Sequence, residues 1–488
     1  MHTNATTSQI VTCKKGVDID ALAKDYSLAP TFIYRHALNG LAAPMDTNTI
    51  RKLKTDSRII AVEWDSPVEL CDQTNSTGFA RLDIAHFPVA HINGTNKPLN
   101  VGVAILDTGI DPNQTDLTTY TNWSAYQSDG SDWNSHGTEV AGVLCAQDND
   151  FGVVGVAPGV QLWNVQCIGP APFNTWSYIF GGVEFCIDNA DKISVVNMSF
   201  VNAKGSKAPY SSVQGAISVL VQNGIVVIAG AGNDAQDLAG PDGIYGSNDD
   251  AVPAAIPEVM AVSGMDTSLN TNGSSLDIFY SNSNFSQLPF TNLSWSIDSS
   301  GNGTDSSDTT NAPQVISPGN KIDVAAPAVN ILTTGTNNTL VTVNGTSFAA
   351  PHVAGLAALY IAANGRATNT AGVYAIRQAI INNSLPQSQW NSASNTLDPD
   401  TNHEPLAMPS ESWVPQPFIT SAAYVSRGFQ VGLQTVPGYD YSLQTSIDMV
   451  TWTNLWTVSG FGALAPAALT DTNDEPQSFY RLKRQPSR

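Results

Sequence analysis

Between residues 100 and 231 the chain alternates short apolar runs with stretches of helical periodicity. Such alternation constrains the fold strongly, because parallel strands joined through helices must share one sheet with helices on both faces. The alternating segments are 161–168, 178–189, 195–200, 213–223 and 225–231. We therefore predict an α/β domain with a parallel sheet flanked by helices.

Two polar residues lie at the edges of these elements. The run 101–109, Val-Gly-Val-Ala-Ile-Leu-Asp-Thr-Gly, is apolar until Asp107, as expected for a buried parallel strand with a carboxylate at its carboxyl end. In 135–146, Ser-His-Gly-Thr-Glu-Val-Ala-Gly-Val-Leu-Cys-Ala, His136 starts an apolar helix. Both side chains are therefore predicted at element ends, where a site can form.

A third polar residue, Ser347, begins another apolar helix in the stretch 344–356, Asn-Gly-Thr-Ser-Phe-Ala-Ala-Pro-His-Val-Ala-Gly-Leu. Pro351 lacks an N–H and its ring collides with the preceding turn, so the helix must begin only a few residues earlier. Ser347 is thus predicted at the helix N-terminus, where free N–H groups and the helix dipole favour a developing oxyanion. A serine there is ordinarily only a cap, so it indicates catalysis only together with Asp107 and His136.

The sequence motifs around these three residues resemble those of a known protein family. Their order along the chain and the motifs Asp-Thr-Gly, His-Gly-Thr and Gly-Thr-Ser-x-Ala-x-Pro are similar to those of the subtilisin-like serine peptidases. The resemblance covers residues 71–410. It implies a subtilisin-like catalytic domain over that range and a serine endopeptidase that hydrolyses peptide bonds in polypeptide substrates.

The resemblance also implies a role for each residue. Ser347 would be the nucleophile, His136 the general base and Asp107 the group that orients the histidine. Asn233, in a Gly-rich segment, matches the asparagine that stabilises the oxyanion together with the backbone N–H of Ser347. His352 matches a histidine that packs structurally in the family.

The implied substrate cleft binds an extended peptide as an added strand. The residues that match its backbone partners are Ser199, Phe200, Val201 and Asn202. The residues that match the wall of the P1 pocket are Ala231 and Gly232. Relatives often carry Gly-Gly in place of Val201 and Asn202, which predicts a narrower or differently shaped cleft. Asp234 at the expected rim of the pocket would favour a basic P1 residue.

A structural calcium ion is a further implication, because the loop 147–153 follows the His136 helix without insertion relative to relatives that hold calcium there. Calcium requires oxygen ligands, from side chains or backbone carbonyls. By alignment these would come from Gln73, Asp116, Gln147, Asn149, Phe151 and Val153. An ordinary Asp/Asn turn is the alternative.

The N-terminal region predicts a separate unit of alternating elements. We predict strands at 8–14, 31–41 and 58–64 and helices at 19–26 and 47–54. This order is close to the ferredoxin-like β-α-β-β-α-β pattern with its middle strands run together. In length and in segment 34–41, residues 1–70 resemble the inhibitory propeptide of subtilisin-like enzymes. The enzyme would then cut itself near Leu70 or Cys71, and an unrelated small domain is the alternative.

The C-terminal region changes character twice. Residues 266–315 are rich in Ser, Asn, Asp, Thr and Gly and predict a surface insertion, which would either shape specificity or be passive. Prolines scattered through 386–417 predict a linker, with 411–417 as its end. Short alternating stretches predict that 418–488 form a small β-sandwich module, similar to those appended to secreted bacterial enzymes.

Charge and hydropathy limit the classes of partner that the protein can bind. There are 42 acidic and 21 basic residues, a net charge of −21, and no basic cluster, so we expect no nucleic acid partner. We expect no membrane span, because no run of about 18 apolar residues occurs. The N-terminus lacks the basic and apolar regions of a signal peptide, although the resemblance implies a secreted, extracellular protein.

The cysteines do not indicate a dense disulfide framework. Five are present, an odd number, so buried free thiols are expected. A bridge between Cys167 and Cys186 is the alternative.

Two classes of function remain open. The chain is either a serine endopeptidase made as an autoprocessed zymogen or a catalytically inactive peptide- or surface-binding protein on the same scaffold. The four chemical positions Asp107, His136, Asn233 and Ser347 are intact, which favours the enzyme. An α/β-hydrolase is excluded, because the residues around Ser347 do not form Gly-x-Ser-x-Gly.

Overall fold

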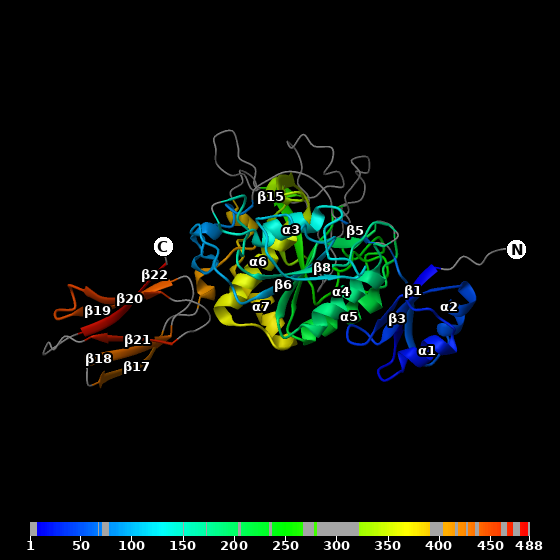
Figure 1. The fold of residues 1–488 in the computed structure, drawn as a ribbon, viewed down its shortest axis with the longest axis horizontal. Coiled ribbons are helices and arrows are strands. Elements are labelled where there is room, and N and C mark those ends of the chain that lie inside the picture. The colour runs from blue at the N-terminus through cyan, green and yellow to red at the C-terminus, as the bar shows by residue number, and fades with distance from the viewer. Residues whose placement is uncertain are drawn as a thin grey trace.

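The computed structural model describes residues 7–66, 68–70, 78–149, 151–171, 173–203, 206–233, 237–266, 278–280, 322–390, 404–414, 418–425, 428–434, 439–459, 466–471 and 479–486. Three parts follow one another along the chain, an N-terminal unit, a central α/β body and a C-terminal β module (Figure 1). Gln73, Cys71, Asp234 and the predicted insertion, apart from Asp266 and 278–280, lie outside the described residues.

The N-terminal unit is a four-stranded antiparallel sheet with two helices. Its strand order is β2-β3-β1-β4, which is the ferredoxin-like arrangement predicted from the sequence. The elements are β1 (Thr7–Cys13), α1 (Ile19–Asp25), β2 (Phe32–Tyr34), β3 (Gly40–Met45), α2 (Thr47–Leu53) and β4 (Ile59–Trp64).

The prediction of one strand over 31–41 is wrong. The chain leaves β2 after Tyr34, and Ala37 and Leu38 are buried before β3 begins at Gly40. A side chain at Gly40 would meet the Val11 carbonyl oxygen at 2.1 Å, so a glycine is required where β3 crosses β1. The helices and outer strands agree with the prediction to within one residue.

The body is built on an eight-stranded sheet with the order β13-β12-β11-β9-β6-β8-β7, with β14 beside β12. All pairs are parallel except β12 with β13. The strands are β6 (Gly102–Asp107), β7 (Thr119–Ser124), β8 (Gln161–Gln166), β9 (Ile193–Met198), β11 (Val226–Gly230), β12 (Met260–Asp266), β13 (Ile278–Tyr280) and β14 (Val324–Pro327). The predicted parallel sheet is confirmed.

Helices flank this sheet, as the alternating pattern predicted (Figure 1). They are α3 (His136–Cys145), α4 (Trp176–Asp188), α5 (Tyr210–Gln222), α6 (Thr346–Asn364) and α7 (Thr370–Asn383). A hairpin of β15 (Ile331–Gly335) and β16 (Thr339–Val343) packs against α3. Short 3₁₀ turns cover Ile84–His86, Pro88–Ala90, Gln387–Gln389 and Glu411–Trp413.

Helix α6 is the central helix of the body. It contacts α3, β9, β11 and β12, and nearly all of its residues are buried. Among the described residues it is the one helix long and apolar enough to cross a membrane, and 89% of that window is buried inside the protein. The apolar side chains of α6 are therefore packed in the core of the body.

The prediction of a linker over 386–417 is wrong for its described C-terminal part. Leu406 pairs with Leu385 and Ala325 through isolated bridges, and its side chain is fully buried. Trp413 is buried as well and packs edge-on against Phe87 with ring centroids 6.0 Å apart. Apolar burial therefore fixes residues 404–414 to the body despite the prolines.

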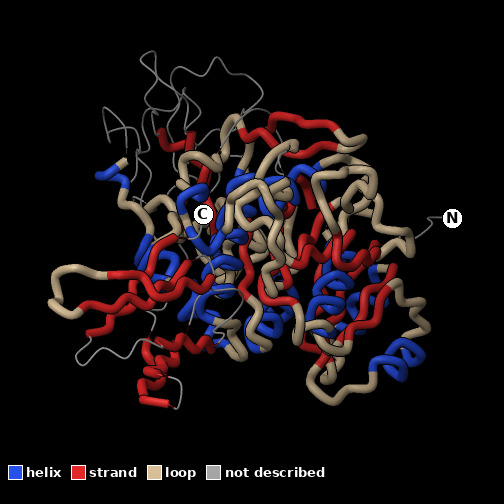
Figure 2. The backbone as a smooth tube through the Cα atoms, turned by 60° about the vertical axis from the view of Figure 1, so that its left-hand side comes forward, coloured by secondary structure: helices blue, strands red, loops and turns tan. Residues whose placement is uncertain are grey.

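The C-terminal module contains two three-stranded antiparallel sheets, β17-β18-β21 and β20-β19-β22, as expected for a small sandwich. Figure 2 shows its strands extending beyond the helices of the body. The strands are β17 (Phe418–Val425), β18 (Gly428–Gln434), β19 (Tyr439–Ser446), β20 (Thr453–Ser459), β21 (Pro466–Asp471) and β22 (Phe479–Pro486). Tyr441 is fully buried, whereas Trp456 is 55% exposed.

The described cysteines are free and buried thiols. Cys167 and Cys186 therefore do not form the bridge that the sequence left open. Burial raises the pKa of both thiols, which keeps them protonated.

Candidate active site

Asp107 and His136 meet where β6 ends and α3 begins. His136 Nδ1 lies 2.8 Å from Asp107 Oδ1. Both residues are buried, with His136 2% and Asp107 1% exposed. The Thr108 N–H donates to the same carboxylate oxygen at 2.7 Å. A side chain at Gly137 would meet the Gly109 carbonyl oxygen at 2.1 Å, so the glycine after His136 is needed for this close approach.

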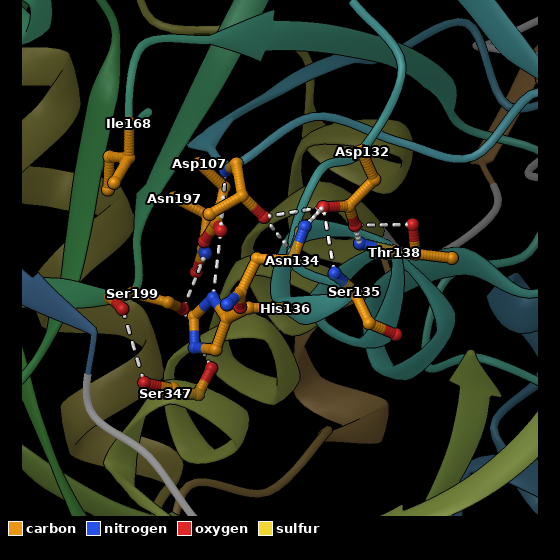
Figure 3. Close-up of polar contacts among 12 residues, drawn as sticks. Asp107, Asp132, Asn134, Ser135, His136, Thr138, Ile168, Asn197, Ser199 and Ser347 are labelled. Carbon is orange, nitrogen blue, oxygen red and sulfur yellow. Dashed lines mark hydrogen bonds and ion pairs between the residues drawn. The ribbon is translucent and has the colours of Figure 1, made fainter. Parts of the chain in front are cut away.

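Ser347 is the second residue of α6 and is fully buried. Gly345 precedes the helix with φ of 132°, a left-handed value that favours glycine and turns the chain into α6. Ser347 Oγ donates to the Ser199 carbonyl at 3.1 Å, and Ser199 Oγ donates to the Ser347 carbonyl at 2.7 Å. Figure 3 shows the His136 ring lying between Asp107 and Ser347.

Asn233 follows β11 and lies beside the start of α6. Its Oδ1 accepts from the Thr346 N–H at 2.9 Å and from Thr346 Oγ1 at 3.1 Å, which fixes the orientation of the amide. Its Nδ2 is buried and has no hydrogen-bond partner among the described residues. A buried donor without an acceptor costs free energy, so such a group calls for a functional explanation.

Asp132, which no sequence pattern indicated, has a carboxylate that binds the two residues before His136 (Figure 3). Oδ1 accepts from Thr108 Oγ1 at 2.8 Å and from the N–H groups of Asn134 and Ser135, both at 2.9 Å. Oδ2 accepts from the N–H and Oγ1 of Thr138 at 2.9 and 2.6 Å. One carboxylate thus ties the residue after Asp107 to the first turn of α3.

His352 lies on α6 but does not join this cluster. Its Nδ1 is 2.6 Å from the Phe348 carbonyl oxygen, and burial lowers its pKa to about 4. A neutral buried imidazole bonded to its own helix has a structural role, as the resemblance implied.

Comparison with known proteins agrees with this arrangement. The model of the subtilase family matches residues 99–406, which span the parallel sheet, α3 and α6. The chain belongs to the subtilase family. It is therefore a member of a family of serine peptidases.

Individual subtilases align over most of the same region. Subtilisin E of Bacillus subtilis is 31% identical over 335 residues, which are 68% of this chain and 73% of that protein. M-protease of Shouchella clausii is 30% identical over 321 residues, covering 65% of this chain and 68% of that protein. The crystal structure of fervidolysin from Fervidobacterium pennivorans, a keratinolytic enzyme related to subtilisin, covers 96% of this chain and 68% of its own, with 18% identity and a TM-score of 0.57.

The segment predicted to bind substrate forms a short strand in this subtilase. β10 (Phe200–Asn202) pairs antiparallel with β5 (Val68–Leu70), and Leu70 stands opposite Phe200. Ser199, just before β10, is buried under Ser347. The backbone of residues 68–70 therefore lies as an added antiparallel strand beside the segment that was predicted to bind substrate.

The predicted pocket wall lies next to this strand. Ala231 is buried, and Gly232 has φ of 102°. A side chain at Gly232 would stand 3.5 Å from Val201 Cγ1, so the valine side chain faces the glycine across the expected pocket. Asn202 is fixed by Val252, whose N–H donates to its Oδ1 at 2.9 Å. The expected narrowing by Val201 stays a prediction.

The predicted calcium ligands gather only in part. Asp116 is fully buried, and its Oδ1 and Oδ2 accept from Asn149 Nδ2 at 3.1 Å and from the Val153 N–H at 2.8 Å. Burial raises the pKa of this carboxyl group. The carbonyl groups of Gln147 and Phe151 belong to the same loop, whereas Gln73 lies outside the described residues. No group of three or more His, Cys, Asp or Glu that could hold a metal occurs within the described ranges.

The N-terminal unit contacts the body through carboxylates that bind backbone N–H groups. Glu184 on α4 accepts from the N–H groups of Arg35, His36 and Ala37 at 2.9, 2.8 and 2.6 Å. In the other direction, Asp65 accepts from the Ser177 N–H at 2.7 Å, at the first turn of α4. The Asp65 carboxylate thus lies at the N-terminus of α4, where the helix dipole stabilises a negative charge.

Proposed function

We propose that this subtilase is a serine endopeptidase in which Ser347 attacks the carbonyl carbon of a peptide bond. His136 takes the serine proton and returns it to the leaving amine, and a water molecule then hydrolyses the acyl-enzyme by the same route. Asp107 keeps the proton of the imidazole on Nδ1 and stabilises the imidazolium. The buried 2.8 Å contact between Asp107 and His136, beside the α6 N-terminus that carries Ser347, is the observation on which this proposal rests.

The oxyanion of the tetrahedral intermediate needs donors that are already in place. Asn233 Nδ2 is a buried donor without a partner among the described residues, and Thr346 holds its amide in one orientation. The N–H of Ser347 lies in the first turn of α6, at the positive end of the helix dipole. We assign these two groups to the oxyanion hole.

Polypeptide substrates fit the strand at β10. Residues 68–70 pair with 200–202 as an added antiparallel strand, which is how an extended peptide would bind. If the bond after Leu70 is the one that Ser347 cuts, residues 68–70 are in the position of a product. This supports an autoprocessed zymogen in which residues 1–70 are the enzyme's first substrate and then its inhibitor.

A calcium ion would be held by the loop 147–153 and Asp116. Their carboxylate, amide and carbonyl oxygens are the donors that calcium prefers, and Asp116 is fully buried with the neutral partners Asn149 and Val153. Asn149 would have to present its oxygen in place of Nδ2. The ion would supply structural stabilisation to the loop that follows α3.

Expression of the chain beside its Ser347→Ala variant tests the proposal. We expect only the unmodified chain to lose about 7 to 8 kDa by intact mass, the mass of about 70 residues, and to react with a fluorophosphonate probe. If neither chain shortens and neither is labelled in the presence of calcium, the endopeptidase is excluded and the inactive binding protein becomes the better hypothesis.

Chelation tests the calcium proposal independently of activity. Ca²⁺ that binds only the folded chain raises the midpoint temperature of thermal unfolding. EDTA should therefore lower this midpoint temperature by several degrees in the Ser347→Ala chain. Asp116→Asn should remove that difference. Equal midpoints with Ca²⁺ and with EDTA in the unmodified loop would exclude the site.

A further inference from the structure

We propose that Ser199 is a positioning residue for the nucleophile, because its hydroxyl group holds the backbone of Ser347 at a point where α6 cannot hold it alone. This inference rests on the proposed endopeptidase and adds to it a residue that acts through Ser347. The family resemblance assigns only the backbone of Ser199 to the substrate cleft, so a role of its side chain is a separate property.

The need for an outside donor follows from Pro351, which lies inside α6. In an α-helix the carbonyl group of residue 347 accepts from the N–H of residue 351, four residues further on. Proline has no N–H, so the helix does not supply this regular donor. Ser347 is fully buried, so bulk water does not reach its carbonyl group. A buried carbonyl group requires a donor, and here the donor must come from another element.

The Ser199 hydroxyl group is that donor (Figure 3). Ser199 Oγ lies 2.7 Å from the Ser347 carbonyl oxygen and donates to it. A serine hydroxyl group has one proton, so toward any second partner its oxygen acts as an acceptor. Asn197 Nδ2, at the end of β9, donates to Ser199 Oγ at 2.9 Å and so directs the hydroxyl proton toward Ser347. All three residues are fully buried.

A second bond joins the same two serines in the opposite direction. Ser347 Oγ donates to the Ser199 carbonyl at 3.1 Å. This bond is lost when Ser347 attacks a peptide bond and passes its proton to His136. The bond from Ser199 Oγ to the Ser347 carbonyl can persist through that step. The backbone of the nucleophile is therefore held in place while its side chain moves, which keeps the attack geometry within narrow limits.

Steady-state hydrolysis by Ser199→Ala tests this role. The enzyme is the full chain after its own processing, with active sites counted by fluorophosphonate labelling. The substrate is a peptide with the sequence of residues 66–75, which spans the proposed cut. We expect kcat to fall by about tenfold with KM nearly unchanged, because the backbone of Ser199 is retained while the nucleophile is displaced.

Ser384→Ala is the matched control. Ser384 is also buried, and its Oγ donates to the Ile380 carbonyl at 2.8 Å on α7, at the end of the body away from Ser347 in sequence. This variant loses the same kind of bond, so its midpoint temperature of thermal unfolding should fall while its kcat stays unchanged.

Pro351→Ala provides a test that a loss of stability alone does not satisfy. It restores an N–H four residues after Ser347, so the carbonyl group regains a donor within α6. In the Ser199→Ala background this change should recover most of the lost kcat, whereas beside an intact Ser199 it should alter kcat by less than about twofold. Such coupling is expected only if both residues act on the same carbonyl group.

The outcomes separate this inference from the proposed function. An unchanged kcat in Ser199→Ala, or a loss that Pro351→Ala does not reverse, overturns the positioning role and leaves the endopeptidase intact. If Ser199→Ala does not fold, Asn197→Leu removes the amide that directs the hydroxyl proton and should lower kcat by about threefold, and an unchanged kcat there overturns the role as well. Absence of both cleavage and labelling in the unmodified chain removes the proposed function and this inference with it.

Discussion

The hydrogen bonds around Ser347 and those that join the N-terminal unit to the body have different surroundings. Asp107 and His136 are almost fully buried and belong to elements that share one core. Glu184 and Asp65 instead bind backbone N–H groups where two parts of the chain meet. The N-terminal unit also has a core of its own, which includes Leu22, Leu41 and Leu53.

If residues 1–70 are cut off as proposed, this difference separates a permanent site from a releasable contact. Bonds inside one core persist as long as that core is folded. Bonds at the boundary can be lost while the separate core of the N-terminal unit stays folded, although Ile10, Tyr34, Ala37, Leu38 and Ala42 of that unit are also buried in the core cluster of the body. Substitutions in the first region should therefore change the chemistry, and substitutions in the second should change how long residues 1–70 stay attached.

The largest effect is expected from Asp107→Asn. An amide in this position would leave His136 in the wrong tautomer, and the equivalent change in other serine peptidases lowers kcat by about 10⁴. The rate of self-cleavage, followed by intact mass, and the rate of fluorophosphonate labelling should both fall by that order. An unchanged rate in a chain that folds normally would exclude Asp107 from the proposed triad.

Asn233→Ala should follow, with kcat lower by about 10² to 10³ and little change in KM, because the lost donor acts on the oxyanion. The measurement is steady-state hydrolysis of a peptide by active-site-counted enzyme. Thr346→Val is the matched control, since it removes the Thr346 hydroxyl bonds to Asn233 and Gly232 while leaving Nδ2 in place. Equal losses in both variants would indicate a structural role for Asn233.

The sequence predicted features that follow local rules. An apolar run that ends in Asp107 marks the end of a strand, and apolar runs that begin at His136 and Ser347 mark the starts of helices. These ends meet at one edge of the sheet, because parallel strands run in the same direction. Apolar periodicity also predicted the outer strands and helices of the N-terminal unit.

Features that depend on distant contacts were not predicted. Asp132 carries no local signal of its role, because the role depends on a bond to Thr108, which lies in a different segment after β6. Residues 404–414 read as a linker from their prolines, although Leu406 and Trp413 are buried against segments far away in sequence.

Asp132→Asn should reduce kcat by about tenfold or more with little change in KM. One oxygen of the carboxylate becomes an NH₂ group that faces hydrogen-bond donors, so the first turn of α3 and with it His136 is displaced. The pH profile of kcat/KM should shift with the imidazole, which a merely structural loss of stability would not produce. Asp129→Asn is the control, because Asp129 is exposed in the same loop and accepts from the N–H of Ser131, a residue outside the site. A normal kcat and pH profile in Asp132→Asn would exclude this role.

The smallest effect is expected at the boundary, from Asp65→Asn. Asp65 is 3% exposed and accepts from Ser8 Oγ and the Ser177 N–H, both at 2.7 Å, and burial raises its pKa above the ordinary value of 3.8. A carboxyl group with a raised pKa in the attached state binds its proton more tightly there. Attachment is therefore strongest below about pH 4 and weakens as the pH rises through the raised pKa. Burial raises the pKa of Glu63 in the same direction.

The lag between self-cleavage and the first turnover of a reporter peptide measures release of residues 1–70. In the unmodified chain the lag should shorten severalfold between about pH 4 and pH 7, because the buried charge becomes more costly. Asp65→Asn keeps an acceptor for the Ser177 N–H but carries no charge, so its lag should change less over the same range. A lag that lengthens with pH, or one with the same slope in both chains, would mean that Asp65 does not control release.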